Sequence, residues 1–246
     1  MKRMETIYSN QDYSWSVIAR DPDKPGYIID TNEYLIVSSG QGLLTDPGGS
    51  EIFPEVFSAI CEKFDPTQIK KIFSSHQDPD IISSLSLWLE VNPDLKCYLS
   101  WLWSSFVPHF GGKQDTFIQI PDQGMDVVIG NHTLRAIPAH YLHSSGNFNL
   151  YDPTSRILFS GDVGASLLPP EYTDLFVSDF DRHTQYMKKF HQRWMGSNEA
   201  KKKWIREIRN LKVDMMVPQH GALFQKDQVQ KFLDWFDELE VGITEN

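Results

Sequence analysis

Cysteine is scarce in this chain, since Cys61 and Cys97 are the only two among 246 residues. Two thiols are too few for a disulfide framework or for a metal site built from thiolates alone. Both lie among apolar residues, and that setting favours buried free thiols. A metal site in this protein must therefore draw mainly on nitrogen and oxygen ligands.

Basic residues are also in deficit: 33 acidic against 23 basic residues give a formal net charge of −10. Such a surface repels phosphate backbones, so we expect no nucleic-acid partner. Apolar runs are too short to cross a membrane, and the first residues lack the apolar segment of a signal peptide. We therefore expect a cytoplasmic protein without a membrane partner.

Linkers, repeats and charge blocks are missing as well, although 40% of the residues are hydrophobic and 13% aromatic. That composition is sufficient for one large core. The expected organisation is a single domain over residues 1–246, with neither a flavodoxin-like domain nor a glycine-rich phosphate loop for FMN.

The apolar spacing predicts β hairpins first, including one around residues 40–42, and then alternating helices and strands. Helices are predicted at 51–64, 80–90, 101–106, 179–194, 198–210 and 225–239, and strands at 69–73, 96–99, 116–120 and 215–217. Short β segments fill 127–159. Helices on the outer faces of two stacked mixed sheets would accommodate this order, which is an αββα sandwich of the α/β (α+β) class.

Potential metal ligands follow the predicted strands, at positions where loops converge on one rim of a sheet scaffold. They are three histidines and three aspartates: His76, Asp78, Asp80, His143, Asp162 and His220. Imidazole and carboxylate together suit iron, zinc or manganese. A single aspartate can bridge two metals, and Asp162 is the natural candidate because it is the only acidic ligand in its loop.

A single histidine is more often a structural or surface residue than a ligand. We therefore assign that ordinary role to His109, His132, His183 and His191. His140 lies only three residues before His143, so either could be the ligand. His143 is favoured because Ser144, Ser145 and Gly146 follow it and supply hydrogen-bonding groups. His140 then has a supporting role or is an ordinary loop residue.

At these positions the chain resembles the metallo-β-lactamase superfamily, and within it the lactamase-like part of the flavodiiron proteins. The phrases TDPGG, LHSSGN, LFSGD and PQHG also match, so the resemblance spans about residues 34–223. It implies two iron ions: His76, Asp78 and His143 on one, Asp80 and His220 on the other, and Asp162 shared between them.

Two departures from the flavodiiron pattern are informative. Asp78 replaces a glutamate, and Ile81 stands where a histidine of the second metal is usual. Both are similar to the oxygen-binding di-iron branch, which is associated with bacterial oxygen sensing and chemotaxis. Ile81 would then mark an open position for dioxygen.

The charges of the ligand set agree with dioxygen binding. Three aspartates and two ferrous ions leave the site at about +1, and two ferric ions with a peroxide dianion leave the same charge, a conversion that a low-dielectric pocket favours. Tyr141 or Tyr172 could donate a hydrogen bond to the bound ligand. Aromatic residues near the ligands in sequence could form a dry wall around the site, although core packing is the more common role of such side chains; they are Tyr141, Phe148, Trp101, Trp103 and Phe106.

We therefore expect a non-haem di-iron protein that binds dioxygen for sensing, with a signalling or electron-donor protein as partner. Two alternatives stay open: a metallohydrolase of the lactonase or thioesterase type, with zinc in place of iron, and an oxygen or nitric oxide reductase fed by an external donor. A homodimer is compatible with each of them.

Overall fold

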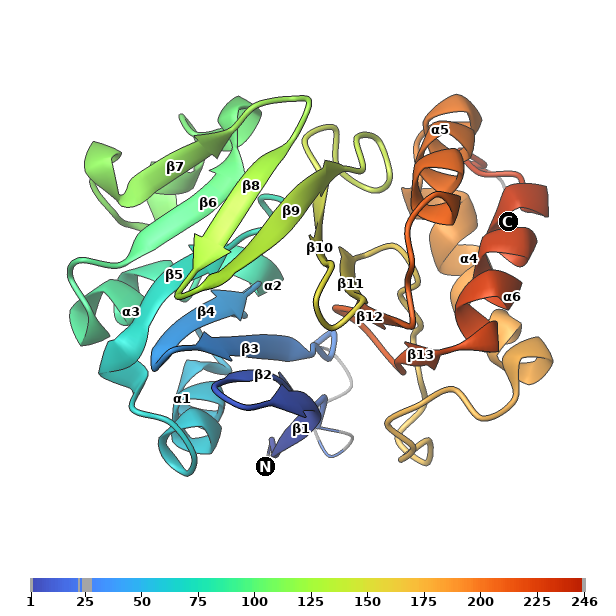
Figure 1. The fold of residues 1–246 in the computed structure, drawn as a ribbon. Helices are drawn as coiled ribbons and strands as arrows, with labels where there is room; N and C mark the ends of the chain where they lie inside the picture. The colour runs from blue at the N-terminus through green and yellow to red at the C-terminus, as the bar shows by residue number, and fades with distance from the viewer. Residues whose placement is uncertain (1, 22, 24–27, 245–246) are drawn as a thin grey trace.

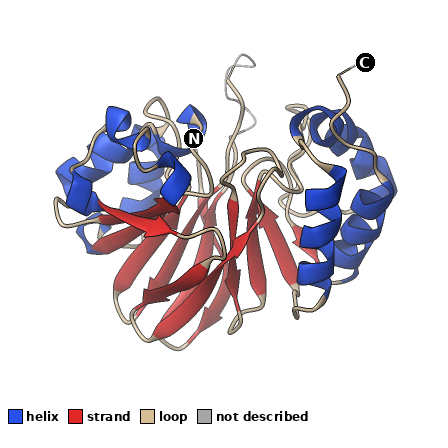
Figure 2. Ribbon diagram, turned by 90° about the horizontal axis from the view of Figure 1, so that it is seen from above, coloured by secondary structure: helices blue, strands red, loops and turns tan. Residues whose placement is uncertain are grey.

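The computed structural model describes residues 2–21, 23 and 28–244. Two mixed β-sheets pack face to face, with helices on both outer faces (Figures 1 and 2). This is the αββα sandwich that the sequence predicts. Among the described residues, no helix combines the length and apolar character that crossing a membrane requires.

The first sheet has seven strands in sequence order, antiparallel from β1 to β4 and parallel from β4 to β7. Its strands are β1 (Met4–Asn10), β2 (Tyr13–Ile18), β3 (Glu33–Ser38), β4 (Gln41–Thr45), β5 (Ile69–Phe73), β6 (Lys96–Ser100) and β7 (Phe117–Ile120). The predicted hairpin is present: Ser39 and Gly40 connect β3 to β4 with positive φ angles of 50° and 74°, as tight hairpin turns require.

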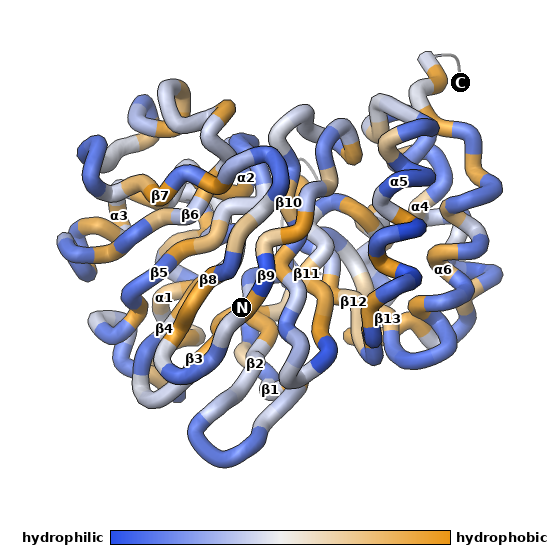
Figure 3. The backbone as a smooth tube through the Cα atoms, turned by 45° about the horizontal axis from the view of Figure 1, so that its top comes forward, coloured by the Kyte–Doolittle hydropathy of each residue, from blue (hydrophilic) through white to orange (hydrophobic). Residues whose placement is uncertain are grey.

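The second sheet has six strands in the order β13-β12-β11-β10-β9-β8, with only β11 and β12 parallel. Its strands are β8 (Met125–Ile129), β9 (His132–Pro138), β10 (Phe148–Asp152), β11 (Ile157–Gly161), β12 (Met215–Pro218) and β13 (Phe224–Gln225). The aromatic core between the sheets includes Trp15, Tyr34, Phe73, Phe148 and Phe159. Apolar residues accordingly concentrate in the strands (Figure 3).

Short helices cover the first sheet and longer ones cover the second. The first group is α1 (Phe53–Cys61), α2 (Pro79–Ile82) and α3 (Leu85–Val91), and the second is α4 (Phe180–Trp194), α5 (Asn198–Arg209) and α6 (Asp227–Glu238). Four short 3-10 helices lie at Pro66–Gln68, Trp101–Trp103, Val107–Phe110 and Gln114–Thr116. A separate cluster of buried apolar residues lies between each sheet and the helices that cover it.

Two predicted helices differ from the structure. The helix expected at 80–90 is interrupted between α2 and α3, because Ser84 donates its backbone N–H to Gly48 and its hydroxyl to Pro47. The segment 101–106 contains only a 3-10 turn, whose start is capped by the hydroxyl of Ser100. In both places a serine hydrogen-bonds outside the regular helix pattern.

The expectation that both cysteines are buried is wrong for one of them. Cys97 is buried on β6, whereas Cys61 is exposed at the end of α1. The buried face of α1 presents Val56, Ala59 and Ile60, and Cys61, one position beyond them, faces solvent. Apolar neighbours in sequence did not indicate which face of the helix Cys61 occupies.

Candidate metal centre

The ends of four strands position most of the candidate ligands. His76 follows β5, Asp162 follows β11 and His220 follows β12, while His143 lies in the loop after β9. Since β4 and β5 run parallel, as do β11 and β12, their carboxyl ends each share one edge of a sheet. The amide of Phe148 donates to the carbonyl of Ser75 at 2.9 Å and joins the two edges.

Three of the predicted ligands form one compact group. The Nε2 atom of His143 lies 2.8 Å from Oδ2 of Asp78, and Nε2 of His76 lies 3.6 Å from the same oxygen. One ligand atom from each of these residues falls within 4.8 Å of the others. This spacing is suitable for a single metal ion coordinated by two imidazoles and one carboxylate.

The remaining predicted ligands form a second group around His220. Its Nε2 atom lies 3.4 Å from Oδ2 of Asp80 and 3.5 Å from Oδ1 of Asp162. The other oxygen of Asp162, Oδ2, faces the first group, 3.7 Å from Nε2 of His143 and 4.0 Å from Nε2 of His76. Asp162 therefore presents one oxygen to each group, which is the arrangement that a bridging carboxylate needs.

Burial and charge give the site strongly perturbed ionisation. Burial alone lowers the pKa of His76 and His220, but neighbouring carboxylates, Asp162 in common, raise both pKa values to about 9. Burial raises the pKa of Asp162, and the adjacent imidazoles of His220 and His76 outweigh it, holding that pKa well below its usual range. The pKa of Asp78 is lowered in the same way by His143 and His76, again against burial. Such perturbation is typical of functional sites.

Hydrogen bonds outside the site orient two of the histidines. Nδ1 of His76 lies 2.9 Å from the hydroxyl of Ser75, which itself donates to Asp46 at 2.7 Å. Nδ1 of His220 donates to the carbonyl of Asp30 at 2.7 Å. Both rings therefore direct Nε2 toward the aspartates, as metal-binding histidines with fixed outer contacts do. Burial raises the pKa of Asp46 to about 7.

The loop that carries His143 adopts an uncommon backbone conformation. Tyr141 and His143 have positive φ angles of 63° and 77°, in a region that residues other than glycine rarely occupy. Hydrogen bonds hold the loop in place, from the amide of Gly196 to the carbonyl of Tyr141 and from the side chain of Asn147 to the carbonyl of Leu142. Strain of this kind is common at functional sites.

The residues for which a supporting role was considered lie in different parts of the structure. Nε2 of His140 donates to the carbonyl of Asp122 at 2.9 Å, so that ring is directed to another loop. The ring of Tyr172 lies 5.8 Å from that of His183, and the side chain of Tyr141 is 57% exposed. Ile81 has no exposed surface and belongs to the apolar cluster between the first sheet and its helices.

The aromatic rings nearest the site were not predicted from the sequence. Phe190 and Trp194 of α4 lie beside His143, with ring centroids 6.3 Å and 5.1 Å from its imidazole. In the described residues, Trp103 and Phe106 pack against each other with ring centroids 5.8 Å apart, and Trp101 donates to Asp122. The signal available in sequence was the four-residue spacing of Phe190 and Trp194, which places both on one side of a helix.

Other groups found in sequence have structural roles. The ring of His132 stacks on Tyr13 at 3.7 Å and bonds to Ser38. His191 is completely buried, and its Nε2 accepts from the amide of Gly164 at 3.0 Å, two residues after Asp162. His183 is buried among aromatic rings. His109 lies in a 3-10 turn at the surface.

The donor set fits a pair of metal ions. Nε2 of His76 and Oδ1 of Asp162 are buried, and neither finds a hydrogen-bond partner in the described part of the chain. Unpartnered buried polar atoms are costly unless a metal or water satisfies them. Histidine nitrogen and carboxylate oxygen suit iron and zinc alike.

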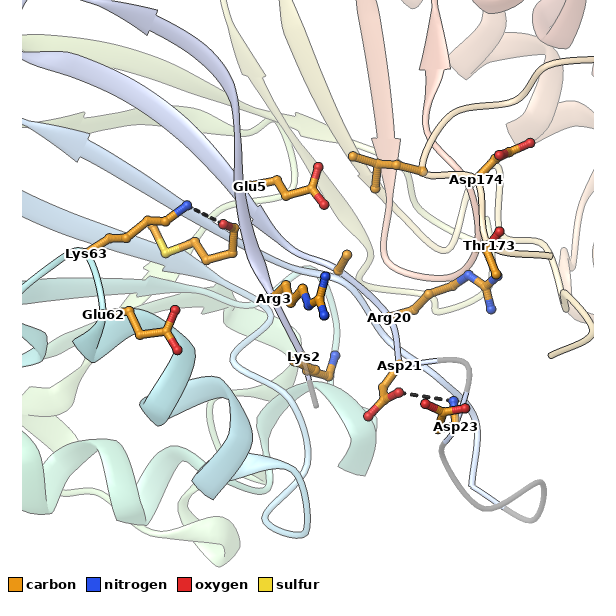
Figure 4. A pocket seen from close by; sticks show the side chains of 14 residues that line it. Lys2, Arg3, Glu5, Arg20, Asp21, Asp23, Glu62, Lys63, Thr173 and Asp174 are labelled. Atoms are coloured by element: carbon orange, nitrogen blue, oxygen red, sulfur yellow. Dashed lines mark hydrogen bonds between the residues drawn. The ribbon is translucent and has the colours of Figure 1, made fainter. Parts of the chain in front are cut away.

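A separate cavity of about 650 Å³ lies near the amino terminus. Figure 4 shows side chains of both charges around it, among them Arg3, Arg20, Glu5 and Asp174. None of the six candidate ligands lines this cavity. The metal-ligand cluster is thus a different feature of the molecule.

Comparison with known proteins shows which family this chain resembles in sequence and fold. A family model described as "ODP family beta lactamase" matches residues 29–221. A solved structure described as "Apo state of chemotaxis sensor ODP from T. denticola" is 38% identical, with a TM-score of 0.88, and the match covers 97% of this chain and 95% of that one. A second, described as "Peroxy diiron species of chemotaxis sensor ODP", is also 38% identical, with a TM-score of 0.87, covering 98% and 96%.

More distant relatives are longer than this chain. An uncharacterized protein of Methanocaldococcus jannaschii is 25% identical over 87% of this chain and 54% of its own length. The flavo-diiron protein FprA2 of Clostridium acetobutylicum is 21% identical over 88% and 56%. The chain thus spans about half the length of the curated relatives it matches.

Proposed function

The chain belongs to the family described as ODP family beta lactamase, and from that premise we propose that it is a non-haem di-iron protein that binds dioxygen as an oxygen sensor. The observation that supports this most directly is the position of Asp162 between His220 and the pair His76 and His143. A relative described as a peroxy di-iron chemotaxis sensor, 38% identical, makes dioxygen the favoured ligand.

In this proposal the six candidate ligands hold two iron ions. His76, Asp78 and His143 would hold one, Asp80 and His220 would hold the other, and Asp162 would be shared between them. Two ferrous ions would supply the electrons that dioxygen binding requires. Asp80, His220 and Asp162 would supply fewer ligands to the second ion than the other group supplies to the first, which would leave room there for dioxygen.

The chain's own residues orient the histidines of the site and keep them buried. The side chains of His76 and His220 are only 1% and 3% exposed, so water has little access on that side. Ser75 and the carbonyl of Asp30 fix the two imidazole rings before any ligand arrives. Fixed rings and a dry surrounding strengthen electrostatic interactions within the site.

The setting we propose is a single domain in the cytoplasm with a signalling protein as its output partner. Both sheets share one apolar core, which supports the single-domain organisation. Zinc in place of iron, or an external electron donor, would instead support a hydrolase or a reductase.

The test is to load the protein with iron, reduce it without air, admit air, and follow the visible spectrum together with metal content. A long-lived absorption band is expected. Absence of the band, combined with bound zinc and turnover of an ester or lactone, would refute the proposal. His143→Gln should abolish the band, whereas His140→Gln, the matched control three residues earlier, should retain it.

A further inference from the structure

Helix α4 places two aromatic rings over the histidines of both metal-ligand groups. The ring of Phe190 lies 6.3 Å from that of His143 and 6.5 Å from that of His220. Trp194, one turn later, lies 5.1 Å from His143 and stacks on Phe190 at 6.1 Å with an interplanar angle of 27°. Phe190 therefore spans the two halves of the site, and Trp194 extends this surface outward.

The two rings differ in exposure. Phe190 is 7% exposed, whereas Trp194 is 53% exposed. Phe190 thus forms a fixed inner wall, packed in the core of the helical layer. Trp194 packs against His143 and Phe190 on one side and is exposed to solvent on the other.

The ligands themselves show where the site is open. The side chains of Asp78 and Asp80 are 30% and 25% exposed, whereas that of His143 is 9% exposed. A molecule arriving from solvent therefore passes the two carboxylates, while Phe190 and Trp194 line the imidazole side. The space that the two apolar rings leave then limits the size of that molecule.

We propose that Phe190 and Trp194 are specificity-determining residues that limit the ligand to a small molecule. A diatomic gas needs little volume and loses little hydration beside aromatic rings, whereas an ester or lactone needs space that the rings occupy. The inference rests on the proposed function, because it assumes metal ions at the six candidate ligands. It adds a reason why this site would bind dioxygen in preference to hydrolysing organic substrates.

The experiment uses cobalt(II)-loaded protein and does not depend on oxygen binding. Formate and the bulky trimethylacetate carry the same charge, and each is titrated against the visible cobalt spectrum to obtain its dissociation constant. In the wild type we expect trimethylacetate to bind far more weakly than formate. Phe190→Ala and Trp194→Ala should each reduce that discrimination by about tenfold, the scale on which apolar pockets separate ligands by size.

Lys189→Ala is the matched control, because Lys189 precedes Phe190 on the same helix and faces solvent. It should leave the ratio of the two dissociation constants unchanged. Trp194→Ala removes a half-exposed ring, so it remains informative if Phe190→Ala does not fold. Phe190→Leu, which keeps an apolar side chain of intermediate size, should give an intermediate ratio.

Two failures are distinguishable. If cobalt binds and the ratio is the same in the wild type and in all three ring variants, this inference is wrong and the proposed function stands. If cobalt does not bind at the candidate ligands, the proposed metal site fails and this inference falls with it.

Discussion

Asp46 holds Ser75 through both of its carboxylate oxygens: Oδ1 accepts the backbone N–H and Oδ2 accepts the hydroxyl, each at 2.7 Å. Because the hydroxyl donates its proton to Asp46, its oxygen accepts from Nδ1–H of His76. With Nδ1 of His76 bonded to Ser75, Nε2 is the ring nitrogen that faces the site. Neither Asp46 nor Ser75 touches the proposed metals, yet both determine how His76 is presented.

Ser75→Ala should therefore weaken metal binding in the half of the site that contains His76. The expected loss of affinity is about 10- to 100-fold, the range found when an outer hydrogen bond to a ligand is removed. Isothermal titration calorimetry with metal measures it. Ser38→Ala is the matched control, since Ser38 bonds to His132 at 2.8 Å outside the site; an equal loss in that variant would contradict the prediction.

Removal of single carboxylates should separate the two halves of the site. Asp78→Ala should lose the metal ion next to His143, and Asp80→Ala the ion next to His220, because each aspartate contacts only one group. Asp162→Ala should lose both ions, since its two oxygens face different groups. Metal analysis after gel filtration measures the stoichiometry. Retention of one full ion in Asp162→Ala would exclude a bridging role.

Metal binding should release protons at neutral pH. The pKa values of His76 and His220 are raised to about 9 in the metal-free protein, where the two imidazoles are charged and paired with carboxylates. A metal ion binds only neutral imidazole, so binding must displace these protons. Apparent affinity should consequently rise with pH and level off above about 9.

Calorimetry in buffers of different ionisation enthalpy measures the protons released. At pH 7 the observed heat should depend on the buffer, with close to two protons released from these histidines. A heat that is the same in all buffers would show that the imidazoles are already neutral.

The sequence was sufficient to predict the sandwich and the six candidate ligands for a physical reason. Strand ends converge on one rim of the sheets. A ligand-type residue directly after an apolar run, such as His76 after β5, can therefore be predicted to lie at that rim. The structure brings all six residues together, and their role as metal ligands stays a prediction. Their division into two groups was implied by the family resemblance alone, and the distances that define the groups come from contacts between loops distant in the chain, as in the 3.5 Å approach of His220 and Asp162.

The aromatic surroundings could not be predicted because helix packing decides them. Phe190 and Trp194 have the spacing of any apolar helix face, and nothing in the sequence shows that this face meets His143. Tyr141 and Phe148, which are close to His143 in sequence, were the natural candidates. Yet Tyr141 has a left-handed backbone conformation and is more than half exposed to solvent.

Acid should destabilise the protein through His183. Its imidazole is 2% exposed, and neither ring nitrogen has a hydrogen-bond partner in the described residues. Burial lowers its pKa from 6.5 to about 4, so the unfolded chain takes up a proton first as pH falls. Above pH 6.5 His183 is neutral in both states and does not reduce the free energy of unfolding. Between pH 6.5 and about pH 4 this free energy falls, by up to about 1.4 kcal/mol per pH unit.

His183→Phe removes this titration while keeping a ring in the aromatic pocket. At pH 5 the variant should withstand more urea than the wild type, and the difference should diminish toward pH 8. His109→Phe, at an exposed histidine, serves as control and should show no such trend. A difference between His183→Phe and the wild type that stays constant with pH would contradict the assignment.

The departure at Ile81 can be tested by restoring a histidine there. Ile81 and its neighbour Ile82 are both completely buried in the same apolar cluster, so a histidine at either position should destabilise the metal-free protein by about 1–3 kcal/mol. Only Ile81→His occupies the position after Asp80 where a second-metal ligand is expected. Iron should therefore restore the thermal stability of Ile81→His and not that of Ile82→His.

The air-dependent absorption band should also decay faster in Ile81→His, because the added imidazole takes the vacant coordination position. Equal recovery of both variants, or an unchanged lifetime of the band, would mean that the isoleucine at position 81 does not keep that position open.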